Sequence, residues 1–218
     1  MFVLIPTCLV LAGLFIYVQR KGYPVPALIL KGLASLCFVV LGFLCSPGTL
    51  SARLILSGLC LGCAADVLLG LRSVFVQQKQ MFFLAGGVVF FGGHLLYLAA
   101  VWPMLKYKAL CVMISVLLTY ILLRWLFDRI EAPKALKRFG AVYFGVFMLL
   151  NCAAVCNAIT APSAFSILLA SGTLLFLCSD VILNLYSFGS GLGFGFRVLY
   201  SALYYIGQIL IALSLLFL

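Results

Sequence analysis

The sequence predicts an all-α integral membrane protein with eight transmembrane helices, arranged as two four-helix repeats. Of its 218 residues, 67% are hydrophobic and only 8% are charged, whereas soluble domains have roughly 45–50% and about 25%. The apolar residues fall into eight long runs, and about 20 apolar residues are enough for a helix to cross a bilayer core. The second half of the chain also repeats features of the first, which predicts the two-repeat arrangement.

Composition and charge exclude several other classes of protein. A disordered chain would be poor in apolar residues. The formal net charge is +10, but the basic residues are scattered between apolar runs and form no patch with interleaved aromatics, so no nucleic-acid partner is expected. The connections between the runs are short. Residues 1–218 are therefore expected to form a single transmembrane domain.

The eight runs define the expected helices in chain order. They are residues 2–18, 24–45, 52–71, 81–102, 106–127, 137–157, 163–186 and 194–218. The first lacks the basic residues and cleavage site of a signal peptide, so it is expected to persist as a helix. Pro24 and Pro26 suit the first turn of the second helix, Ser46-Pro47-Gly48 indicates a turn, and Pro162 opens the seventh helix.

The distribution of Lys and Arg predicts the orientation. Ten of the 14 basic residues lie in or beside the first, third, fifth and seventh connections. Because cytoplasmic loops carry the excess of Lys and Arg, these connections are expected to be cytoplasmic and both termini to lie on the opposite side.

An internal repeat appears when the chain is compared with itself. Residues 58–71 align without gaps to residues 172–185, an offset of 114 that also pairs Gly93-His94 with Gly207-Gln208. The repeats are expected to span residues 1–104 and 105–218. Because each half has an even number of helices, the halves are expected to be related by an axis along the membrane normal. Chance similarity between Leu-rich helices is the alternative.

Two acidic residues lie where lipid would surround them. Asp128 and Glu131 belong to the basic fifth connection, but Asp66 and Asp180 lie inside apolar helices, where a charged carboxylate costs roughly 2.5–3.5 kcal/mol. They occupy equivalent positions of the repeat, near the predicted cytoplasmic ends of their helices. We expect them to face each other, share one proton and act as a catalytic acid/base pair. Alternatively, each bonds a neighbouring helix as polar glue.

Further polar residues are expected near this pair. Lys31, Arg72 and Arg197 lie near the same end and suit a phosphate group, although positive-inside anchoring is the alternative. The expected substrate-binding set is Lys31, Arg72, Asn184, Arg197, Tyr204, Tyr205 and Gln208. His94 is expected about 12 Å deeper than the aspartates, from the helical rise, so a structural role is predicted for it.

Tyr97 and Asn151 are likewise predicted to be structural polar residues, and Tyr143 contributes to the polar cavity. The nine Cys residues lie within or at the ends of the apolar runs. Packing as small apolar side chains explains them better than metal binding or redox chemistry does. No metal or cofactor is predicted.

At these residues the sequence resembles the lysoplasmalogenase family, also called the YhhN family. The resemblance is carried by the segments 62–69, 83–97, 175–184 and 204–208 in their order and spacing. The family commonly has Gly before the first Asp, where this chain has Ala65. The resemblance implies a membrane hydrolase that splits the vinyl-ether bond of lysoplasmalogen or a related lysophospholipid, with Asp66 and Asp180 as its functional aspartates.

Three other functions fit parts of this pattern. A proton-coupled transporter also uses an intramembrane Asp pair within a repeat. An intramembrane aspartyl protease has two such Asp residues, but its Gly-x-Gly-Asp signature is missing, since Gly191-Leu-Gly193 precedes Phe194. A helical scaffold without catalysis is the third. The sequence leaves the oligomeric state and the headgroup preference open.

Overall fold

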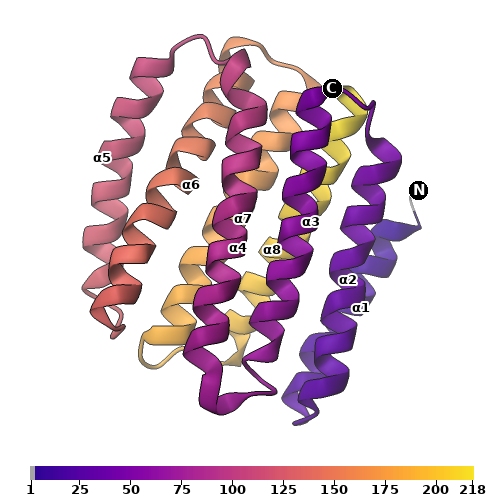
Figure 1. Ribbon diagram of the computed structural model, residues 1–218, viewed down its shortest axis with the longest axis vertical. Helices are drawn as coiled ribbons and strands as arrows, with labels where there is room; N and C mark the ends of the chain where they lie inside the picture. Colours follow the sequence, from indigo (N-terminus) through magenta and orange to yellow (C-terminus); the bar gives the residue numbers. More distant parts are fainter. Residues whose placement is uncertain (1–2) are drawn as a thin grey trace.

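The computed structural model describes residues 3–218, which form eight α-helices and no β-strand (Figure 1). The helices are α1 Leu4–Arg20, α2 Pro24–Cys45, α3 Leu50–Leu71, α4 Lys79–Val101, α5 Lys108–Phe127, α6 Lys134–Thr160, α7 Ala164–Phe188 and α8 Phe194–Ser214. Short 3-10 turns flank two of them: η1 Val76–Gln78, η2 Trp102–Met104 and η3 Leu215–Phe217. The all-helical prediction is confirmed.

Seven helices in the described part of the chain are long and apolar enough to cross a membrane. The exception is α1, which is apolar but has only 17 residues, the lower end of what a span requires. Seven helices therefore support the prediction of a multi-pass membrane protein. The eighth span and the division into two repeats stay predictions.

The helices pack in two rows (Figure 1). One row contains α4, α3 and α2, and the other contains α7, α8 and α1. Helix α6 packs against both α4 and α7 and so closes one end of the rows, while α5 packs against α6 at the outer edge. Residues from both rows therefore meet along the middle of the molecule.

Local signals set most helix ends where the sequence predicts them. Pro24 lies in the first turn of α2, where its missing N–H costs no hydrogen bond. Ser163 caps α7: its hydroxyl accepts from the backbone N–H of Ser166, whose side chain accepts from the N–H of Ser163. Helix α6 begins at Lys134 rather than residue 137, because Lys134, Ala135 and Leu136 all favour a helix although they lie outside the predicted run.

Two pairs of glycines let helices approach closely. An added Cβ on Gly93 of α4 would lie 3.3 Å from the backbone oxygen of Gly58 of α3. One on Gly207 of α8 would lie 2.8 Å from the backbone oxygen of Gly172 of α7. The second pair stands 114 residues after the first, the offset of the sequence repeat. Small residues at both crossings allow the backbones to touch.

Replacing Gly207 by Ala is expected to destabilise the protein by about 1–3 kcal/mol, because the new methyl group meets rigid backbone. The matched control is Gly195→Ala on the same helix, where an added Cβ meets nothing within 4 Å and alanine favours the helix. Thermal unfolding in detergent should show a lower Tm for Gly207→Ala alone. Equal Tm values for the two variants would contradict this account of the crossing.

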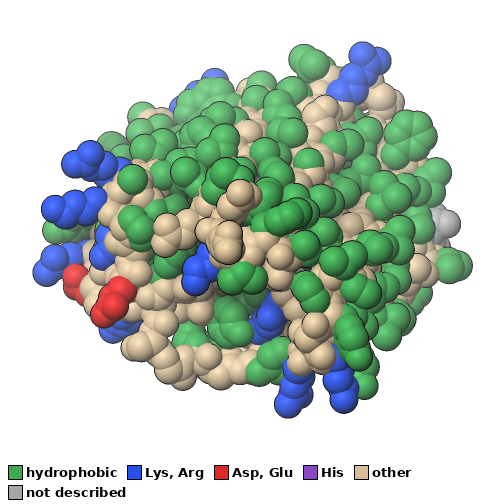
Figure 2. All heavy atoms as spheres, turned by 60° about the horizontal axis from the view of Figure 1, so that its bottom comes forward, with side chains coloured by type: hydrophobic (Ala, Val, Ile, Leu, Met, Phe, Trp, Pro, Cys, Tyr) green, Lys and Arg blue, Asp and Glu red, His purple; other side chains and the backbone are tan. Residues whose placement is uncertain are grey.

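Basic side chains gather at one end of the molecule. The first, third, fifth and seventh connections all lie at the lower end of Figure 1, and Figure 2 shows Lys and Arg side chains around this end. The charge asymmetry along the sequence is thus an asymmetry between the two ends of the bundle. We refer to this end as the basic end.

Candidate active site

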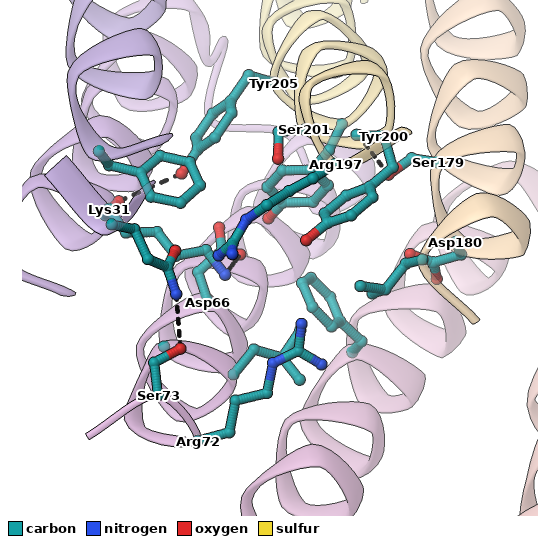
Figure 3. A pocket seen from close by; sticks show the side chains of 17 residues that line it. Lys31, Asp66, Arg72, Ser73, Ser179, Asp180, Arg197, Tyr200, Ser201 and Tyr205 are labelled. Atoms are coloured by element: carbon teal, nitrogen blue, oxygen red, sulfur yellow. Dashed lines mark hydrogen bonds and ion pairs between the residues drawn. The ribbon is translucent and has the colours of Figure 1, made fainter. Parts of the chain in front are cut away.

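A pocket lies near the basic end, between the two rows of helices. Both intramembrane aspartates line it, together with three basic residues (Figure 3). These polar residues come from four helices and one helix end: Lys31 from α2, Asp66 from α3, Arg72 just after α3, Asp180 from α7 and Arg197 from α8. The fold therefore brings together residues that lie far apart in the sequence.

Asp66 is 2% exposed and has two strong partners. One carboxylate oxygen, Oδ1, lies 2.9 Å from Nζ of Lys31. The other, Oδ2, accepts a hydrogen bond of 2.5 Å from the Ser35 hydroxyl. Lys31 and Ser35 lie one turn apart on α2 and so present both groups to the same carboxylate. Asp66 is consequently held as one member of a buried ion pair.

Asp180 has different neighbours. It is 5% exposed, and its Oδ2 accepts a hydrogen bond from the hydroxyl of Tyr143 on α6. That hydroxyl lies 2.9 Å from Nε2 of His94 on α4, and the His94 ring stacks on Phe147. Because the Tyr143 proton goes to Asp180, its oxygen accepts from an Nε2–H of His94. A chain of two hydrogen bonds thus links His94 to Asp180.

The geometry does not support the prediction that Asp66 and Asp180 share one proton. Asp66 and Asp180 line the same pocket but lie on different sides of it (Figure 3). Each carboxyl bonds partners of its own, Lys31 and Ser35 for Asp66 and Tyr143 for Asp180. The repeat register predicts a common depth for the two residues, but it carries no information on which side chains from other helices reach them.

The prediction that His94 is remote from the aspartates was wrong. It estimated depth along the helix axes and ignored the length of side chains. The Tyr143 hydroxyl lies between the two side chains and bonds both, so His94 is two hydrogen bonds from Asp180. His94 is fully buried, and its structural role stays a prediction.

Two guanidinium groups line the pocket without a carboxylate partner. Within residues 3–218 the ion pairs are Lys31 with Asp66 and Arg124 with Asp128. Arg72, just beyond the end of α3, donates to the Ser187 hydroxyl at 3.4 Å. Burial lowers the pKa of the Arg72 guanidinium below its ordinary value, and the positive charge of Arg197 also lowers it. An anion between Arg72 and Arg197 would relieve this repulsion.

One face of α8 adds polar groups to the pocket. Arg197, Ser201 and Tyr204 recur at helical spacing and all line it. Nε of Arg197 and Oγ of Ser201 are buried and have no hydrogen-bond partner among the described residues. Since buried polar atoms are nearly always satisfied, such atoms facing a pocket indicate that a polar ligand or water completes the site.

The remaining predicted residues divide between the pocket and the interior. Tyr205 lines the pocket, and Asn184 lines a neighbouring pocket, its side chain donating to the backbone oxygen of Asp180 at 2.9 Å. Gln208 lies outside both pockets: it is fully buried and accepts from Tyr97 at 3.3 Å. Its position about three turns beyond Arg197 on α8 places it deeper in the bundle than the pocket, and its assignment to substrate binding stays a prediction. Asn151 bonds its own helix, at the backbone oxygen of Phe147.

Sequence reasoning missed two residues of the site. Ser35 was not considered, although its position four residues after Lys31 is a signal that both share a helix face. Tyr143 was placed in the polar cavity but given no contact with Asp180. Only the packing of α6 against α4 and α7 shows that contact.

Comparison with known proteins gives one match. The model of the YhhN family matches residues 26–215, a range that includes every residue of the site described above except the α1 residues that line the pocket. No curated protein and no solved structure matches the chain.

Proposed function

Since the chain belongs to the YhhN family, we propose that it is a membrane hydrolase that cleaves the vinyl-ether bond of lysoplasmalogen. The products are a fatty aldehyde and glycerophosphoethanolamine or glycerophosphocholine. The observation that carries the proposal is a single pocket that contains two carboxyl groups and two guanidinium groups without carboxylate partners. Carboxyls suit the ether chemistry, and guanidinium groups suit a phosphate.

The chemistry needs one proton donor and one proton acceptor. An acid protonates the β carbon of the vinyl ether and leaves an oxocarbenium ion. Water adds to this cation and loses a proton to a base, which gives a hemiacetal. The hemiacetal collapses to the aldehyde, and the glycerol oxygen leaves as an alcohol. Glycoside hydrolysis uses two carboxyl groups on a similar cation.

The surroundings of the two aspartates favour different roles. We assign Asp180 as the acid, because among residues 3–218 no basic side chain forms an ion pair with it. Asp66, paired with Lys31, is assigned as the carboxylate that accepts the proton of water and stabilises the cation. Tyr143 and His94 position the Asp180 carboxyl through their hydrogen bonds.

The headgroup is assigned to the basic end. Arg72 and Arg197 bind the phosphate, with the unpartnered Ser201 hydroxyl beside them. Excess Lys and Arg at this end supports a cytoplasmic location for it. The active site would then face the cytoplasmic half of the membrane, and membrane lipids would be its surroundings and its source of substrate.

The direct test is aldehyde release by the purified protein in detergent. Lysoplasmalogen is compared with the corresponding 1-alkyl lysophospholipid, which has the same headgroup and chain but lacks the double bond. Aldehyde from the first substrate alone is expected. No aldehyde, together with lysolipid flux across sealed vesicles that contain the protein, would reject hydrolysis in favour of proton-coupled transport.

Replacing Arg197 by Gln is expected to raise KM for lysoplasmalogen about 10- to 100-fold with little change in kcat, because a charged hydrogen bond to phosphate is lost. The control is Arg138→Gln, an exposed residue at the same end of the molecule. Steady-state kinetics over a range of substrate concentrations measures both constants. Equal KM values in the two variants would remove Arg197 from the phosphate site.

A further inference from the structure

A second pocket adjoins the first on the other side of Asp180. It lies between α4, α6 and α7, and we call it the apolar pocket. The two pockets share Leu69, Phe90, Asp180 and Leu183. Asp180 is therefore the ionisable residue common to both pockets.

The lining of the apolar pocket differs sharply from that of the first. Apart from Asp180, Asn184 and Tyr143, its walls are aliphatic, aromatic or glycine residues, and it contains no basic side chain. Phe83 and Phe139 contribute rings, and Gly87 lies opposite Phe139: an added Cβ on Gly87 would be 3.1 Å from Cε1 of that ring. The absence of a side chain on Gly87 thus lets the Phe139 ring pack directly against α4, and a larger residue at this position would have to displace that ring within the pocket wall.

We propose that the apolar pocket binds the hydrocarbon chain of the lipid substrate. This inference rests on the proposed function. With the phosphate near Arg72 and Arg197 in the first pocket and the chain in the second, the junction between headgroup and chain lies beside Asp180. The vinyl-ether bond is at that junction, so the two pockets present the reacting carbon atoms to the carboxyl group.

The placement also gives the apolar pocket a role in specificity. A chain that fills a hydrophobic site gains affinity with each methylene it buries. A side chain that narrows the pocket should therefore penalise long chains and spare short ones. General damage to the protein would lower activity on all chains alike.

The first test replaces Gly87 by Leu, with Val88→Leu as the control, since Val88 is the next residue on α4 and is 51% exposed. Both variants are assayed on lysoplasmalogens that share one headgroup and differ in alkenyl chain length. Gly87→Leu is expected to lose at least about tenfold in kcat/KM on the longest chain relative to the shortest. An equal change on all chain lengths, or the same profile for both variants, would overturn the proposal.

The second test does not depend on hydrolysis. The wild-type protein is irradiated with a lysophosphatidylcholine that carries a diazirine midway along its chain, and labelled peptides are identified by mass spectrometry. Labelling is expected between residues 83 and 90 and between 136 and 144, and excess unlabelled lysolipid should abolish it. Labelling confined to outward-facing residues of α5 would overturn the proposal. Labelling as expected without aldehyde release would reject the hydrolase and retain the chain pocket.

Discussion

Replacing Asp180 by Asn is expected to lower kcat for aldehyde release by about 10²- to 10⁴-fold, the contribution of a positioned acid or base. The amide has nearly the shape of the carboxylic acid, and its oxygen can still accept the hydrogen bond from Tyr143. It has no acidic proton to give to the vinyl-ether carbon. The loss should therefore appear in kcat, measured at saturating lysoplasmalogen.

The control for this substitution is Asp128→Asn. Asp128 is an exposed carboxylate whose partner is Arg124 at 3.8 Å, and such surface pairs contribute little. It should leave kcat unchanged. Thermal unfolding of both proteins tests for a loss of fold. Undiminished aldehyde release by a folded Asp180→Asn variant would remove Asp180 from the chemistry.

Replacing Lys31 by Met is expected to destabilise the protein by about 3–5 kcal/mol, because Asp66 would be left as a buried charge without its partner. The ammonium lies 2.9 Å from the carboxylate, and the two side chains are 15% and 3% exposed. Adding Asp66→Asn should recover much of the loss, since the amide is neutral and can still accept from Ser35. Unfolding of the wild type, both single variants and the double variant gives the coupling between the two positions.

The matched control is Lys134→Met, an exposed lysine at the same end of the molecule, which should change stability little. The expected order of Tm is wild type, then the double variant, with Lys31→Met lowest. If Lys31→Met alone were as stable as Lys134→Met, the ion pair would not hold Asp66, and the roles assigned to the two aspartates would need to be exchanged.

The fold was largely predictable from the sequence, because membrane-spanning helices appear as long runs of apolar residues. Runs of apolar residues gave the number and order of the helices, and α2 has the predicted bounds, 24–45. Helix ends were less accurate where the helix continues beyond the predicted run. Helix α6 extends to Lys134 at one end and Thr160 at the other. Hydropathy detects the part of a helix that suits lipid, whereas the helix itself ends where its backbone hydrogen bonds do.

The site was predictable in its members and less so in its contacts. Asp66, Asp180, Lys31, Arg72 and Arg197 were selected because each is a charge in an apolar chain, and all five line one pocket. Gln208 was predicted to bind substrate and lies deeper than this pocket, because its helix face was recognised but its depth was not.

By itself, the sequence determined that the protein is helical and suited to a membrane, that its basic connections lie at one end, and which polar residues need explanation. Each of these follows from the residues of a single segment and from the free energy of placing them in lipid or in water. Only the tertiary structure decided that Asp66 pairs with Lys31, that Asp180 is linked through Tyr143 to His94, and that an apolar pocket adjoins Asp180. These depend on how side chains from different helices meet, because a contact between helices is fixed by packing and side-chain reach and is not encoded in either helix alone.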